Sequence, residues 1–185
     1  MVDIMSASQT QLIPFSELAP GEAASIRRKL IDKVVQLAVQ ETRLSPGQVV
    51  VRDLRPDTDL LLYTAGVDAA VMDWAAMTGT TAGAFETMGT GTNSSDRWIL
   101  IYGVKLAENC SCSQLKFNIG GGDRVIWDLG GLKEDDDYVG FSPAGIVMKP
   151  NDPYTISRWV IKISSSATIV LKGVVVEPRG KVISP

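Results

Sequence analysis

The sequence predicts a mostly β protein: an antiparallel β-sandwich, jelly-roll-like, with an N-terminal extended arm and one amphipathic helix. Three observations carry this prediction. Short runs of alternating apolar and polar residues fill the chain from Asp96 onward, glycines and prolines separate those runs, and one helical apolar repeat precedes them. Short strands at this spacing, with no helices between them, favour two packed antiparallel sheets.

The alternation is clearest in residues 114–119 (QLKFNI) and 154–163 (YTISRWVIKI). A period of two places the apolar side chains on one face of a strand. Gly120-Gly121-Gly122 follows the first of these runs. A phosphate-binding loop would need a Gly-Lys-Ser/Thr ending and a following helix, and both are absent from this pattern. The glycines therefore predict a tight turn between strands.

Residues 22–44 have the apolar repeat of an amphipathic helix. Glu22 favours the start of this helix through the helix dipole, and Ser45-Pro46-Gly47 predicts its end. We predict that its apolar stripe is an interface. The stripe packs on the chain's own β body or, as the minority alternative, on a neighbouring subunit. Its residues recur at spacings of four, four and three: Ile26, Leu30, Val34 and Leu37.

Composition divides the chain into an N-terminal arm and helix, residues 1–47, and a β-sandwich domain, residues 48–185. Residues 1–20 are polar and mixed, and we expect them to form an extended arm. Residues 78–95 (TGTTAGAFETMGTGTNSS) are rich in Gly, Thr and Ser, which predicts a flexible surface loop. The isolated apolar side chains of this loop are candidate anchors on a partner: Phe85 and Met88.

The chain contains no histidine and only two cysteines, Cys110 and Cys112. Lack of histidine excludes Ser-His and Cys-His catalysis and histidine-ligated metals. A single Cys-x-Cys pair is at best half a zinc site. No candidate nucleophile has an evident activating partner in the sequence. We therefore expect no enzymatic activity, no catalytic residues, no cofactor and no metal centre, although the acidic run at residues 134–137 leaves a cation as an open alternative.

The formal charge of −3 is spread along the chain rather than gathered into a basic stripe, so we expect no nucleic-acid partner. The apolar runs are far shorter than the roughly 20 residues of a membrane span, so we expect no membrane partner. The first ten residues lack a basic region followed by an apolar stretch, so we expect no signal peptide.

The C-terminal half, residues 98–185, resembles capsid cement (decoration) proteins of tailed bacteriophages of the cyanophage-like kind. The resemblance is a ladder of strands with glycine turns and a Glu-Pro-x-Gly close. It does not extend to residues 1–44. The stretches that carry it are Ile101-Tyr102-Gly103-Val104, Gln114-Leu115-Lys116-Phe117, Trp127-Asp128-Leu129, Pro150-Asn151-Asp152 and the final GVVVEPRG of residues 173–180.

The resemblance implies a structural virion protein that binds the outside of the capsid and cements neighbouring major capsid protein subunits. It implies a homotrimer on the capsid surface, assembled in the host cytoplasm, with no catalytic residues. Two alternatives stay open. One is a head–tail connector or tail component, and the other is a receptor- or carbohydrate-binding β-sandwich module, which needs exposed aromatic side chains on one face.

Overall fold

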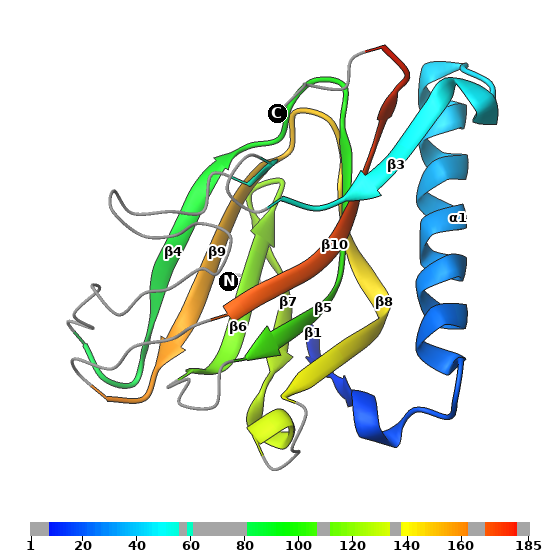
Figure 1. Ribbon diagram of the computed structural model, residues 1–185. Helices are drawn as coiled ribbons and strands as arrows, with labels where there is room; N and C mark the ends of the chain where they lie inside the picture. Colours follow the sequence, from blue (N-terminus) through cyan, green and yellow to red (C-terminus); the bar gives the residue numbers. More distant parts are fainter. Residues whose placement is uncertain are drawn as a thin grey trace.

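Two five-stranded sheets pack face to face in the part of the chain that the structure, a computed structural model, describes (Figure 1). That part comprises residues 8–55, 59–60, 81–106, 112–133, 138–162 and 169–180. Sheet A has the order β1 (Ser8–Gln11), β7 (Gly122–Asp128), β6 (Cys112–Ile119), β9 (Pro153–Val160) and β4 (Ala84–Thr92). Sheet B has the order β2 (Ile13–Pro14), β8 (Val139–Met148), β5 (Trp98–Leu106), β10 (Ile169–Pro178) and β3 (Val49–Asp53).

The eight strands from β3 to β10 have the strand order of a jelly roll. Four of them form the row β4-β9-β6-β7 and the other four form the row β3-β10-β5-β8, and the chain passes between the rows at nearly every connection. Every pairing within these rows is antiparallel. The predicted antiparallel β-sandwich is therefore confirmed, and its order is that of two interlocked Greek keys.

The main core lies between the two sheets. Phe117 and Trp127 face each other there across β6 and β7, with ring centroids 4.8 Å apart at an interplanar angle of 60°. Trp127 is fully buried. Strand β5 is buried along nearly its whole length because sheet B is covered on both faces. The central strand of sheet B therefore reads as a continuous apolar run, WILIYGVKL, rather than as an alternation.

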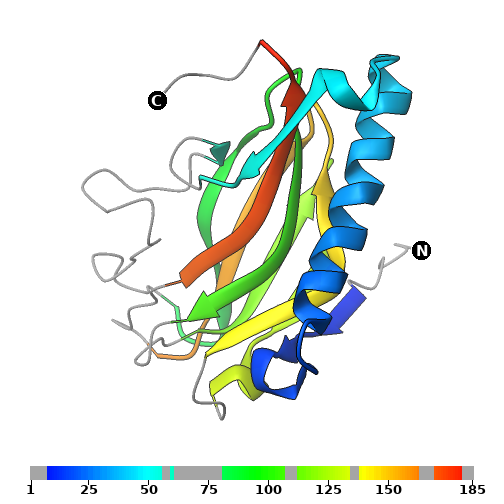
Figure 2. The ribbon, with the colours of Figure 1, turned by 45° about the vertical axis from the view of Figure 1, so that its right-hand side comes forward.

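Helix α1 (Glu22–Thr42) covers the outer face of sheet B and forms a second core with it (Figures 1 and 2). Leu30 and Val34 are buried, with Val34 only 1% exposed, while Ile26 and Leu37 are partly buried against the same cluster. Ala38 is fully buried as well. The predicted stripe thus packs on the chain's own sheet, and the chain itself occupies this side of the helix.

The N-terminal arm is part of the sandwich from Ser8 onward, where it forms two short extended strands. β1 pairs in parallel with β7 at the edge of sheet A, and β2 pairs antiparallel with β8 at the edge of sheet B. Leu12, between these two short strands, is 3% exposed and belongs to the main core. The arm therefore closes one side of the sandwich by adding a strand to each sheet.

The prediction of a flexible loop over residues 78–95 is wrong for Ala84–Thr92, which form the nine-residue strand β4 at the edge of sheet A. Pairing with β9 holds this segment in a strand conformation despite its glycine content. A Cβ at Gly91 would lie 2.6 Å from the Tyr154 hydroxyl oxygen, so a larger residue there would have to displace this buried tyrosine. The predicted turn at Gly120 and Gly121 is present, with φ of 69° and 88°.

Replacement of Val34 by Asp should destabilise the fold by about 3–5 kcal/mol, because it leaves an unpaired carboxylate between α1 and sheet B. The matched control is Gln36→Asp on the exposed side of the same helix, which should change stability by less than about 0.5 kcal/mol. Urea denaturation of the two variants measures both values. Equal midpoints would contradict the packing of α1 on the sheet.

Replacement of Leu12 by Ala should destabilise the fold by about 2–5 kcal/mol, because Leu12 fills the core at the side that the arm closes. Gln11→Ala removes a neighbouring exposed side chain and is the control. Thermal melting of both variants distinguishes an arm that belongs to the fold from one that is dispensable. An unchanged melting temperature for Leu12→Ala would show that the arm is dispensable.

Candidate contact surfaces

The outer face of sheet A carries an aromatic pair on neighbouring strands. Phe85 on β4 lies opposite Trp159 on β9, and their rings meet edge to face with centroids 5.0 Å apart and an interplanar angle of 78°. The Lys116 ammonium, on β6, lies 4.6 Å from the centroid of the Phe85 ring. Both aromatic side chains are half-buried. Because every second residue of a strand faces outward, these three side chains share one surface, which we call the aromatic face.

Hydroxyl side chains extend the aromatic face along β4 and β9. The Thr90 and Thr155 hydroxyl oxygens lie 3.1 Å apart, and the Thr90 hydroxyl also donates to the Tyr154 carbonyl oxygen at 3.0 Å. Thr90 is exposed and Thr155 is half-buried, whereas Ser157, between Thr155 and Trp159 on β9, is buried. Among the described elements no helix lies across this face, since α1 packs on sheet B (Figure 1). The surface therefore offers both apolar area and hydrogen-bonding groups to a partner.

The two predicted loop anchors have different places in the structure. Phe85 is on the aromatic face, whereas Met88 is 4% exposed and lies in the core between the sheets. Met88 is therefore wrong as a contact anchor. Met88 lies three positions after the outward-facing Phe85, so the period-two alternation of β4 turns it inward. The sequence signal for this strand is the run of threonines in AFETMGTGT, because β-branched residues favour strands.

A ring of four ionisable side chains closes one end of the sandwich. The Arg52 guanidinium donates to both carboxylate oxygens of Asp59 at 2.7 and 2.8 Å and to Glu177 at 2.9 Å. Arg97 lies 3.2 Å from Asp59 and 3.1 Å from Glu177. Asp59, Glu177 and Arg97 are buried. The two positive and two negative charges neutralise one another inside the protein.

This ion-pair ring joins segments that are distant in sequence. Asp59 also accepts a hydrogen bond from the Arg55 backbone N–H at 2.8 Å, which fixes the chain as it leaves β3. Hydrogen bonding to Asp59 raises the pKa of Arg52 further above its usual value. The sequence alone did not reveal this ring, because its members are as far apart as Arg52 and Glu177. Glu177 at an inward position two residues after Val175 was the available signal.

Tyr154 and Trp98 anchor the two sides of the sandwich by hydrogen bonds. The Tyr154 hydroxyl donates to the Leu60 carbonyl oxygen, and burial raises the pKa of this tyrosine to about 12. The Trp98 indole donates to Glu41 at the end of α1 at 3.0 Å, and Lys149 donates to the other oxygen of the same carboxylate at 2.5 Å. The bond from Lys149 lowers the pKa of Glu41. Trp98 and Trp127 are therefore structural, and Trp159 is the tryptophan that faces outward.

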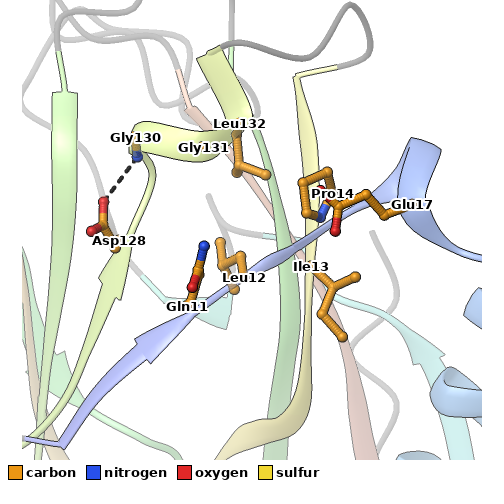
Figure 3. A pocket seen from close by; sticks show the side chains of 9 residues that line it. All are labelled: Gln11, Leu12, Ile13, Pro14, Glu17, Asp128, Gly130, Gly131 and Leu132. Atoms are coloured by element: carbon orange, nitrogen blue, oxygen red, sulfur yellow. Dashed lines mark hydrogen bonds between the residues drawn. The ribbon is translucent and has the colours of Figure 1, made fainter.

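A polar hollow of about 470 Å³ lies between the N-terminal arm and the turn that follows β7 (Figure 3). Its two carboxylates, Asp128 and Glu17, lie at opposite ends, with Leu12 and Leu132 between them (Figure 3). Asp128 accepts a hydrogen bond from the Gly130 backbone N–H at 2.9 Å. This carboxylate therefore stabilises the turn, and the arrangement is not that of a carboxylate pair working on one substrate atom.

The remaining sequence candidates are only partly described. Cys112 is buried, and its thiol donates to the Gln114 carbonyl oxygen at 3.2 Å. Cys110 and the acidic run at residues 134–137 lie outside the described residues. Over the described ranges, no three or more His, Cys, Asp or Glu side chains gather as ligands for a metal ion. No described helix is long and apolar enough to cross a membrane.

Comparison with known proteins gives no relative for this chain. No protein-family model, no curated protein and no solved structure matches it.

Replacement of Glu177 by Gln should destabilise the fold by about 3–5 kcal/mol, because it leaves an excess positive charge among buried guanidinium groups. The control removes one charge from an exposed pair: Asp53→Asn, whose carboxylate lies 3.0 Å from Arg27 at the surface, should cost less than about 1 kcal/mol. Urea denaturation of both variants measures the difference. A loss for Glu177→Gln no larger than that of the control would show that the ring contributes little.

Proposed function

We propose that this chain is a structural and interaction protein without enzymatic activity, and that it works by contact through the aromatic face. The observation that carries the proposal is the Phe85–Trp159 pair, which lies with Lys116 and the Thr90 and Thr155 hydroxyl groups on a sheet face that no described helix covers. Aromatic side chains combine large contact area with few rotatable bonds, and they are enriched at protein contacts. The composition agrees, since the chain has no histidine.

Within this class we propose a capsid cement protein of a tailed bacteriophage, which binds the outside of the shell and joins neighbouring major capsid protein subunits. The resemblance of residues 98–185 to such proteins motivates this step. The jelly-roll strand order supports it as an analogy of fold, since viral capsid proteins commonly use this architecture. A homotrimer on the capsid surface is the assembly that we propose. Its contacts would add interface area across subunit joints without any chemistry.

A carbohydrate-binding module is the second candidate, because Trp159 and Phe85 lie beside hydroxyl groups of β4 and β9. Jelly rolls also form lectin domains, and aromatic rings next to hydrogen-bonding groups suit sugar rings. A head–tail connector or tail component is a third candidate. Connectors assemble in rings, so the mass of the purified oligomer separates a ring from a trimer.

Replacement of Phe85 and Trp159 together by Ala should weaken attachment to capsids of the parent phage at least about tenfold, because it removes the apolar centre of the aromatic face. Cosedimentation of purified protein with capsids measures the affinity and the copy number at saturation. The control is Val51→Ala, which truncates an exposed apolar side chain on sheet B, 40% exposed, and should bind like the native protein.

Saturable binding at a copy number near that of the capsid lattice sites supports the cement proposal. A native chain that does not sediment with capsids overturns it. Binding to an array of glycans that is lost in the same double variant favours the carbohydrate module instead. Native capsid binding by the double variant would show that contact uses another surface.

A further inference from the structure

A second surface lies on sheet B, at the end of the sheet that α1 leaves uncovered. Figure 2 shows that the helix crosses the sheet and that the end of β5 and the starts of β8 and β10 extend beyond it. Three adjoining hollows of about 310, 180 and 340 Å³ lie over this region and the adjacent start of α1. Lys172 lines all three of them, so they form one continuous surface, which we call the basic groove.

The floor of the basic groove is aromatic. The Tyr102 and Phe141 rings are stacked, with centroids 6.2 Å apart and an interplanar angle of 5°. Phe15, from the turn before α1, lies 5.9 Å from the Phe141 ring and is 46% exposed, which makes it one of the few large apolar side chains at the described surface. The groove therefore has an apolar floor that is open at the Phe15 end.

Lys105, Lys172 and Arg27 line the walls of the groove, and Asp53 is the carboxylate among the described lining residues. Lys172 lies opposite Gly103 and Lys105 lies opposite Val170 on the paired strands β10 and β5, so the two lysines are diagonal neighbours on the same face. Both line the same 310 Å³ hollow. Like charges at neighbouring positions of a sheet repel each other. Neither lysine forms an ion pair or hydrogen bond in the described part of the chain.

The start of α1 adds to this positive potential. Ala23 and Ala24 of its first turn line the middle hollow, and the N-terminal end of a helix carries a partial positive charge. Arg27 lies 5.9 Å from the Tyr102 ring centroid and is paired with Asp53 at 3.0 Å. Glu22 accepts a hydrogen bond from the Ala19 backbone N–H and screens part of the helix charge. Within the described residues no carboxylate pairs with Lys105 or Lys172, in a protein whose formal charge is −3.

We propose that the basic groove binds an acidic, apolar segment of a partner protein, with its carboxylates between Lys105 and Lys172 and its apolar side chains on the exposed Phe15. Charge complementarity defines this occupant. A protein segment fits better than a single-stranded nucleic acid, which needs exposed rings for its bases to stack on. Tyr102 and Phe141 are only 7% and 9% exposed, which leaves Phe15 alone for stacking.

The probe is a fluorescently labelled synthetic peptide of about twelve residues in which Asp and Glu alternate with Leu and Phe, long enough to span several hollows. Fluorescence anisotropy should show saturable binding that weakens as salt is raised, because the lysines are at the surface. Two companion peptides should bind at least about tenfold more weakly. One replaces the acids by Ser, and the other replaces Leu and Phe by Ser. A labelled oligothymidylate of the same length tests the nucleic-acid alternative.

The decisive variant is Lys105→Glu/Lys172→Glu. It should bind the acidic peptide at least about tenfold more weakly and gain affinity for the matching peptide with Lys and Arg in place of the acids. The matched control reverses the same number of charges on the exposed side of α1, Lys29→Glu/Lys33→Glu, and should bind like the native chain. A gain of binding to the basic peptide cannot arise from unfolding, so the outcome is informative even if the variant is less stable.

Equal affinity of the two charge-reversed variants for the acidic peptide overturns the proposal. So does binding of the oligothymidylate at least as tight as that of the acidic peptide, or no binding of the acidic peptide at all. The basic groove is on the opposite sheet from Phe85 and Trp159, and the peptide assay uses purified chain without capsids. A negative peptide assay would therefore not contradict the proposed contact through the aromatic face. A negative capsid cosedimentation would not contradict the proposal for the basic groove.

Discussion

Burial of sheet B on both faces is the constraint on which the rest of the structure depends. Sheet A covers its inner face, and α1 covers its outer face through Leu30, Val34 and Ala38. Neither cover could be removed without exposing a continuous apolar strand such as β5, in which eight of nine residues are buried. The helix is thus the third layer of the fold, and its apolar stripe, for which a neighbouring subunit was the minority alternative, is occupied within the chain. Contacts with partners must use other surfaces.

One end and one side of the sandwich are closed in different ways, the end by buried charges and the side by the N-terminal arm. At one end, two positive and two negative side chains that neutralise one another take the place of apolar packing. They are Arg52, Arg97, Asp59 and Glu177. Such rings stabilise little compared with apolar packing, but each member strongly penalises loss of its partners. On one side the arm inserts Leu12 between the edges of both sheets. These two closures link residues from the beginning, middle and end of the chain.

The sequence predicted those parts of the fold in which a local pattern and the tertiary environment agree. The periodicity of apolar residues predicts the helix and the strand β6. The glycines predict the turn after β6, where Gly120 and Gly121 indeed have positive φ. Strand β4 was not predicted, because its glycines signal flexibility while its pairing with β9 is set by residues far away in sequence. The basic groove could not be found from sequence either. Lys105 and Lys172 are 67 positions apart, and only the register of β5 and β10 makes them neighbours.

The helix also makes the two broad faces of the molecule different. The outer face of sheet A offers an aromatic pair among hydroxyl groups, whereas the outer face of sheet B offers a short charged groove beside the helix. A partner that meets the aromatic face gains mostly apolar contact, which depends weakly on salt, and a partner that meets the groove gains mostly charge attraction, which salt screens. Because the faces are on opposite sides of the sandwich, the two proposed contacts would not compete for one surface. The one-sided cover of α1 is what makes the two faces unlike.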